Sequence, residues 1–248
     1  WGNQLDLAYG VLKSGNDDAR KNEDKIEFNS KVGYKVTSTS KFYYTFLLNF
    51  KSQFADGYNY PNLDTVVSTW LAPGYLLLSA GVDWRPLDYF SLYLSPATGK
   101  FTFVTDQTIA DLGTYGNDPA VYDSAGVLIS HGKTTRSEFG ALFVATFAKD
   151  LIKNVNLTTK ATLFNNYTDP VKANRANIDV NWDLLLTMKV NSWLAATVYG
   201  ALIYDNDIFI QDLDPETGLS KGTGGPRTQL KEGIGISLTY KIGDEARK

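Results

Sequence analysis

Hydrophobic and polar positions alternate with a period of two over residues 176–190. One parity is apolar: Ile178, Val180, Trp182, Leu184, Leu186, Met188 and Val190. The other parity is mostly polar: Asn177, Asp179, Asn181, Asp183, Thr187 and Lys189. Successive side chains of a strand leave opposite faces, so this alternation predicts a strand. Its length exceeds the usual strand of about 5–6 residues and is sufficient to cross a bilayer with one face in lipid.

The same rhythm recurs along the chain and predicts ten strands. The expected segments are 1–13, 25–37, 41–53, 74–85, 88–96, 135–148, 153–167, 176–190, 193–205 and 227–243. Short connections alternate with long ones: "TSTS" and "RPLD" are short, whereas 55–72 and 97–134 are long. Short turns on one side and long loops on the other are typical of outer-membrane barrels. A soluble barrel would instead be polar outside and apolar within.

We therefore predict a single all-β domain over residues 1–248, a transmembrane up-and-down antiparallel β-barrel of ten strands with short periplasmic turns and long extracellular loops. Ten strands that begin and end on the short-turn side place both termini in the periplasm of a bacterial outer membrane. The expected partners are outer-membrane lipid and other outer-membrane proteins or lipoproteins. A net charge of −3, spread along the chain, gives no basic patch for nucleic acid.

The polar parity predicts a lumen of mixed charge. Its expected lining residues are Asp6, Glu27, Lys31, Lys51, Asp83, Arg85, Lys160, Asp179, Asp183, Lys189 and Lys231. A barrel of about eight strands is just filled by its own side chains, so ten strands leave a crevice at most. We favour a packed interior in which opposite charges pair. The alternative is a narrow path for ions or small solutes.

The composition offers little for catalysis, metals or cofactors. The chain has no cysteine and one histidine, so neither a disulfide nor a thiolate metal site is available. His131 stands beside Ser130 in a long loop, and a barrel hydrolase or acyltransferase would need a serine or an acid next to it. The acidic run at 212–218 lacks the ligand spacing of a calcium loop. We expect no catalytic residues, no metal site and no cofactor. No uninterrupted apolar run of about 18 residues exists. No signal peptide is recognised either, so we expect that a leader has been removed and that the sequence is mature or trimmed.

The segment 97–134 is the longest predicted loop, and unstructured loops beyond about 12–15 residues are uncommon unless they are functional. Its working polar groups would be Lys100, Asp106, Gln107, Asp111 and Tyr115. Two interpretations stand: a strand extension followed by a cap above the membrane, which we favour, or a plug that folds into the lumen.

Several stretches resemble a family of Bacteroidota outer-membrane β-barrel proteins classed as a domain of unknown function. They include "LDLAYGVLKSG", "DKIEFNSKVGYK", "LLNFKSQFADGYNYPN" and "LAPGYLLLSAGVDWRPLDYF", between Leu5 and Gly116. The resemblance implies an outer-membrane location, no established activity and no catalytic residues to transfer. It also implies a further segment before Trp1, which would make twelve strands in the full-length protein.

Three functions are consistent with these features. The first and favoured one is a non-enzymatic structural or accessory barrel in an outer-membrane assembly. The second is a narrow porin or transporter for small solutes. The third is a membrane hydrolase or acyltransferase, which depends on His131 alone.

Overall fold

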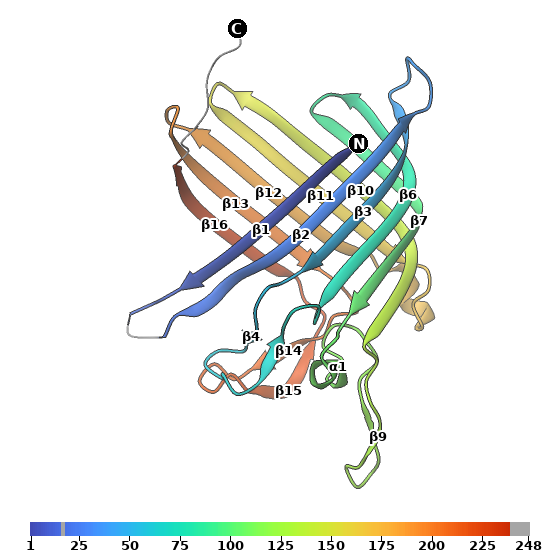
Figure 1. The fold of residues 1–248 in the computed structure, drawn as a ribbon, viewed down its shortest axis with the longest axis vertical. Helices are drawn as coiled ribbons and strands as arrows, with labels where there is room; N and C mark the ends of the chain where they lie inside the picture. Colours follow the sequence, from blue (N-terminus) through green and yellow to red (C-terminus); the bar gives the residue numbers. More distant parts are fainter. Residues whose placement is uncertain (16–17, 239–248) are drawn as a thin grey trace.

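The computed structural model describes residues 1–15 and 18–238, and these form an all-β fold. Its main element is a ten-stranded antiparallel sheet with strand order β1-β2-β3-β6-β7-β10-β11-β12-β13-β16 (Figure 1). The strands are β1 (Gly2–Leu12), β2 (Arg20–Lys35), β3 (Phe42–Ser52), β6 (Gly74–Leu87), β7 (Phe90–Phe103), β10 (Thr135–Ile152), β11 (Val155–Asn166), β12 (Asp179–Lys189), β13 (Leu194–Tyr204) and β16 (Gln229–Leu238). The prediction of ten antiparallel strands in chain order is confirmed.

Most strand bounds shift by a few residues from the predicted ones, and the largest shift among the described residues is at the end of β7. β7 continues through residues 97–103, which had been assigned to the long loop, because this stretch pairs with β6 on one side and β10 on the other. Lys100 therefore lies on a strand, directly opposite Leu77 and Glu138, in the strand extension of the favoured interpretation rather than in a loop or plug. Part of the last predicted segment, residues 239–243, lies outside the described residues.

The connections are sorted by length between the two ends of the sheet (Figure 1). The short ones lie at the end that also holds the N-terminus, and the long ones gather at the other end. The long connections carry β4 (Gly57–Tyr58), β5 (Val66–Ser68), α1 (Gln107–Asp111), β8 (Val121–Tyr122), β9 (Leu128–Ser130), η1 (Lys172–Ala176), β14 (Ile210–Leu213) and β15 (Ser220–Gly225). We call these the turn end and the loop end.

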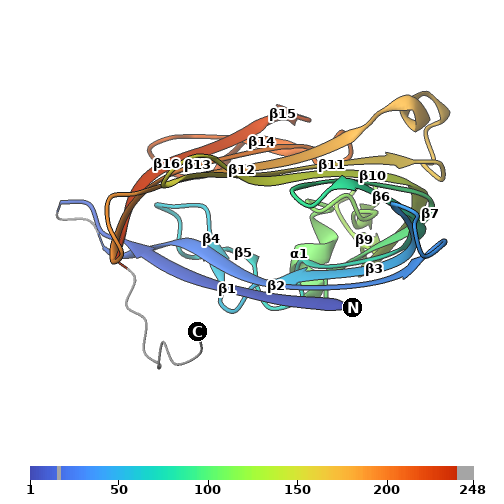
Figure 2. The same cartoon turned by 90° about the horizontal axis from the view of Figure 1, so that it is seen from above.

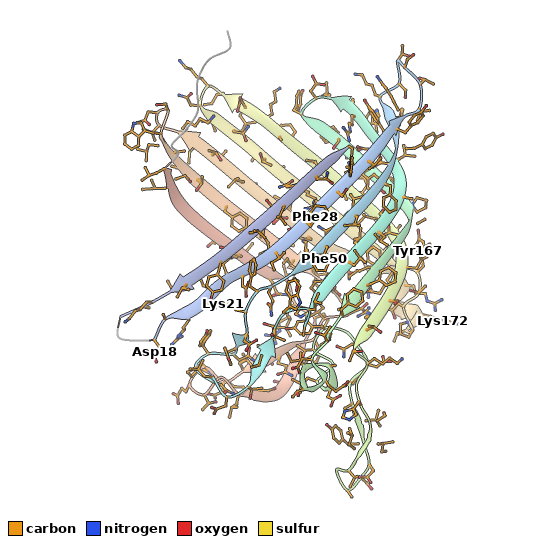
Figure 3. The ribbon with its side chains drawn as sticks, viewed as in Figure 1. Asp18, Lys21, Phe28, Phe50, Tyr167 and Lys172 are labelled. Atoms are coloured by element: carbon orange, nitrogen blue, oxygen red, sulfur yellow. The ribbon has the colours of Figure 1, made fainter. Side chains whose placement is uncertain are left out.

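The register places the predicted lumen residues on one face of the sheet. Asp6, Glu27, Lys51 and Tyr75 lie opposite one another in successive strands, and so do Lys160, Asp183, Ala201 and Lys231. Directly opposed residues of an antiparallel pair point to the same face. The remaining predicted lumen residues have the same parity. The other face carries apolar side chains such as Phe28 and Phe50, which are opposed across β2 and β3 (Figure 3).

The sheet curls until its two halves face each other. Seen from above, β1, β2 and β3 form one layer, β10 to β16 form the other, and β6 and β7 join them (Figure 2). The curl leaves two edges: β1 and β16 do not pair with each other over the described residues. A distant ion pair crosses the opening, from Lys231 Nζ on β16 to Glu23 Oε1 on β2 at 4.0 Å.

Apolar side chains also occupy the concave face, which the alternation had not predicted. Four of them are buried and two are partly buried, and we call this set the inner apolar cluster: Tyr93, Leu142, Val144 and Phe164, with Leu47 and Leu77. A tight approach in β10 supports it, since a Cβ on Gly140 would lie 1.9 Å from the Asn165 carbonyl oxygen. Only glycine allows β10 and β11 to come so close.

A second buried cluster lies at the loop end, where Ala72, Val104, Ile109 and Ala110 pack together with Val66 and Tyr115. Within residues 1–15 and 18–238, no helix is long and apolar enough to cross a membrane.

Candidate functional site: a cavity on the concave face

A cavity of about 720 Å³ lies between the two halves of the sheet. Its walls include Leu47 and Lys51 from one half and Lys160 and Phe164 from the other. Residues of three long connections close the loop end over it: Asn59, Leu112, Thr114, Tyr115, Ile208, Phe209, Ile210, Gln211 and Leu213. The volume is that of a small-molecule site, and the walls combine apolar surface with a few charged groups, as such sites do.

One lysine holds three carboxylates near the loop end of this cavity. Lys100 Nζ lies 3.5 Å from Glu138 Oε2, 3.2 Å from Asp179 Oδ2 and 3.3 Å from Asp205 Oδ2. Its ammonium also lies 5.3 Å from the centroid of the Phe164 ring, a cation–π contact. Because these groups come from β7, β10, β12 and the segment after β13, Lys100 ties the joining strand β7 to the β10–β16 half of the sheet across the concave face.

Arg136 extends this network. It donates to Glu138 Oε1 at 3.0 Å, to an oxygen of Asp207, and to the Gly116 carbonyl oxygen at 3.1 Å. We call the whole set the mouth cluster: Lys100, Arg136, Glu138, Asp179, Asp205 and Asp207. Four carboxylates face two cations, so its formal charge is negative. Within the described residues, no group of three or more His, Asp or Glu side chains is arranged to hold a metal ion.

Deeper in the cavity the balance of charge reverses. Glu27 Oε1 lies 3.5 Å from Lys51 Nζ, Glu27 Oε2 lies 3.9 Å from Lys25 Nζ, and Asn49 Nδ2 donates to Glu27 at 2.8 Å. Lys160 faces this group from β11, within electrostatic range of Lys51 and Glu27. Unlike Lys51, Lys160 has no carboxylate oxygen within 4.0 Å among the residues that the structure describes.

A separate charged set lies toward the turn end. Asp83 is fully buried, and its Oδ2 contacts Lys31 Nζ at 2.9 Å and Arg85 Nε at 2.7 Å. The Lys31 ammonium lies 5.3 Å from the Tyr93 ring, and the Tyr93 hydroxyl hydrogen-bonds Ser79 at 2.8 Å. A smaller hollow of about 400 Å³ there shares no lining residue with the large cavity. Tyr93 of the inner apolar cluster contacts Lys31 of this set, whereas the other five members of the cluster line the large cavity, so the cluster lies between the two.

The eleven predicted lumen residues divide into groups. Glu27, Lys51, Lys160, Asp179 and Asp183 line the cavity, whereas Lys31, Asp83 and Arg85 form the set toward the turn end. Asp6 accepts from Gln4 on the same strand at 3.0 Å, and Lys231 lies near the open edge. Lys189 is exposed at the end of β12. The sequence did not lead us to Arg136, Asp205 or Asp207. Asp205 could have been found, because it has the same parity as the inward-facing residues of β13 and follows directly after Tyr204.

The segment 104–134 lies at the loop end, and its β8–β9 hairpin projects away from the sheet (Figure 1). Asp106 caps α1 by accepting from the Ile109 amide at 3.0 Å, and Gln107 Nε2 donates to Asp111 Oδ1 at 2.8 Å. The Tyr115 hydroxyl donates to the Val67 carbonyl at 2.8 Å, and burial raises the pKa of Tyr115 to about 12. Tyr115 and Leu112 face the cavity, so we call this segment the cap.

The single histidine is paired with an acid in the cap. His131 Nδ1 lies 2.9 Å from Asp111 Oδ2, and the Gly132 amide donates to Asp111 Oδ1 at 2.7 Å. No serine hydroxyl contacts His131 among the described residues, and the imidazole side chain is 59% exposed. A histidine–carboxylate pair is therefore present, without the nucleophile that a hydrolase would need.

The Asp111 pair predicts a local pH dependence. The hydrogen bonds from His131 and Gln107 lower the pKa of Asp111. Because the pKa of Asp111 is lowered, its ionised carboxylate stabilises the folded cap at pH values above the ordinary aspartate pKa. This stabilisation is lost as the pH falls through the lowered pKa. We expect the NMR shift of the Gly132 amide to titrate with a midpoint below the ordinary aspartate range. The titration should vanish in Asp111→Asn and persist in Asp118→Asn, because the Asp118 carboxylate pairs with Lys133 and not with His131 or the Gly132 amide. A midpoint at the ordinary value would contradict the assignment.

Comparison with known proteins gives one match. Residues 1–58, which span β1, β2 and β3, match the profile of a family described as a protein of unknown function (DUF3078). The match covers the N-terminal part of the chain, so that part is similar to a domain of unknown function. No curated protein and no solved structure matches the chain significantly.

Proposed function

We propose that this chain is an integral outer-membrane β-barrel protein of a Gram-negative bacterium of the Bacteroidota, acting without catalysis as a structural or accessory component of an outer-membrane assembly. The observation that carries the proposal is the exposed apolar face on the convex side of the sheet. Leu94 on β7 is 57% exposed and Ile234 on β16 is 85% exposed, while charged side chains such as Asp83 and Glu138 are buried on the concave side. Water would penalise this arrangement, whereas lipid favours it.

The ends of the sheet support the same proposal. Phe42 and Trp84, near the turn end, stack with ring centroids 6.2 Å apart, and Phe139 packs against Tyr167 near the loop end. Aromatic side chains at both interfaces anchor membrane barrels. By this analogy the turn end faces the periplasm and the cap faces outward. The convex face then contacts lipid, and the cap and other long loops are available to outer-membrane proteins or lipoproteins.

Trp182 offers a direct test of the lipid contact. It lies on the convex face in the middle of β12, and its indole N–H donates to Thr159 Oγ1 at 2.8 Å, which satisfies the donor away from water. In a variant that keeps only this tryptophan, we expect strong fluorescence quenching by lipids brominated deep in the acyl chain.

The matched control keeps only Trp70, which lies in the connection between β3 and β6 at the loop end. We expect this tryptophan to be quenched weakly by the same lipids. Equal quenching of the two, or no quenching of Trp182, would reject the membrane proposal.

The pore alternative makes the opposite prediction for conductance. The cap covers one end of the cavity and the inner apolar cluster separates it from the turn end, so we expect inserted protein to give no steady open steps in a planar bilayer. Steady steps whose ion selectivity changes in Lys51→Gln would favour a narrow pore instead. Insertion is verified in the same preparation by protease protection of the strands.

A further inference from the structure

The inward-facing side chains of β10 and β11 form a continuous strip along the cavity wall, which we call the track, and its two ends differ in chemistry. Lys160 lies opposite Thr146, Thr162 opposite Val144, and Phe164 opposite Leu142. Lys160 and Phe164 are four positions apart, a span of about 13 Å along a strand. The track therefore runs from an ammonium group, over an apolar stretch of the inner apolar cluster, to the mouth cluster, where Lys100 lies against Phe164.

The two ends differ in charge. At the mouth, four carboxylates surround two cations, and each cation is already paired. At the deep end, Lys51 and, from the set toward the turn end, the Asp83-paired Lys31 lie within electrostatic range of Lys160, as do the carboxylates of Glu27 and Asp183. Glu27 is already paired with Lys51, so Lys160 is a cation in a confined, partly apolar space without an ion pair among the described residues. A ligand anion there would gain a charge-assisted contact without displacing an existing pair.

We propose that the cavity binds a single-chain anionic amphiphile of the fatty-acid class, with its carboxylate at Lys160 and its chain along Val144, Leu142 and Phe164. The negative mouth cluster repels the carboxylate and so fixes this orientation. The apolar body is recognised by burial against the inner apolar cluster, which supplies most of the affinity that a hydrocarbon chain can gain. The inference is independent of the accessory role proposed above, because a silent barrel and a pore would both contain this track.

The test uses the full chain in lipid nanodiscs, with labelled decanoate as the probe and empty nanodiscs subtracted. We expect saturable binding to the wild type, weakened by about tenfold or more in Lys160→Gln, since hydrogen bonds to charged groups contribute about 1.5–3 kcal/mol. Lys189→Gln is the matched control, because Lys189 has the same inward parity on β12 but lies outside the cavity; its affinity should stay within about twofold.

Two further arms make the outcome decisive. The wild type should bind decanol more weakly than decanoate, whereas Lys160→Gln should bind the two with equal affinity. Decylammonium should not compete with decanoate for the wild type. Thr162→Trp, which fills the middle of the track while keeping Lys160, should abolish binding of the probe. The retained fold of each variant is checked by its electrophoretic shift on heating. Binding no greater than in empty nanodiscs, equal loss in Lys160→Gln and Lys189→Gln, or undiminished binding in Thr162→Trp would each overturn the proposal.

Discussion

Replacing Lys100 by methionine is expected to destabilise the fold by about 3–5 kcal/mol, the usual cost of removing one partner from a buried ion-pair network. Methionine keeps much of the length of the side chain but removes the charge that faces Glu138, Asp179 and Asp205. The Glu138 side chain is only 3% exposed, so water cannot replace the lost ammonium group. Unfolding by urea from lipid vesicles, followed by tryptophan fluorescence, measures the change.

Two variants define how this result is interpreted. Lys189→Met removes an exposed lysine of the same sheet and should change the free energy of unfolding by no more than about 0.5 kcal/mol. The double variant Lys100→Met with Asp179→Asn also removes one of the carboxylates left without a cation. It should recover part of the free energy of unfolding lost in Lys100→Met. If Lys100→Met behaves like Lys189→Met, the mouth cluster does not hold β7 against β12 and the segment after β13.

An arginine in place of Leu94 should cost about 2–4 kcal/mol in a lipid vesicle if the convex face contacts hydrocarbon. Leu94 points away from the concave face, with Val82 and Phe143 opposite it on the neighbouring strands. In water, a change at such an exposed position would usually stay within about 0.5 kcal/mol. The same urea experiment in vesicles therefore reports which solvent the convex face meets.

Val127→Arg is the control for this substitution. Val127 is also an exposed aliphatic residue, but it lies in the β8–β9 hairpin that projects from the cap. Its replacement should leave the free energy of unfolding nearly unchanged. Equal and small effects at both positions would show that the convex face is solvated by water, and the outer-membrane assignment would then fail.

The strands could be predicted because period-two alternation is a local property of the chain. Residues 176–190 and 41–53 show it without any knowledge of their neighbours, and each corresponds to one strand, β12 and β3. The extent of β7 was less accessible, since Pro96 and Gly99 interrupt the pattern while pairing to β6 and β10 continues past them. Pairing partners, rather than propensity, decide that boundary.

The cavity was harder to predict because it depends on the curl of the sheet. The Lys100 and Asp205 side chains meet although they are 105 positions apart. Parity assigns a side chain to a face, but it does not reveal which residues on that face meet across it. Parity also gave a wrong expectation for the concave face, which was expected to be polar because its parity holds most of the charged residues. Leu47, Leu77 and Leu142 have this same parity and lie on the concave face.

The strictly sequential order of the strands has a consequence for how the architecture tolerates changes in length. Over residues 1–15 and 18–238, each strand of the large sheet pairs only with its neighbours in that order, and β1 and β16 are its two margins. A whole hairpin gained or lost at either margin would leave every remaining register intact and would keep the long connections at one end. A single strand gained or lost would instead move a terminus to the opposite end. The repeating unit in which this architecture changes size is therefore the hairpin, while the pairs of strands that carry the mouth cluster and Lys160 stay unchanged.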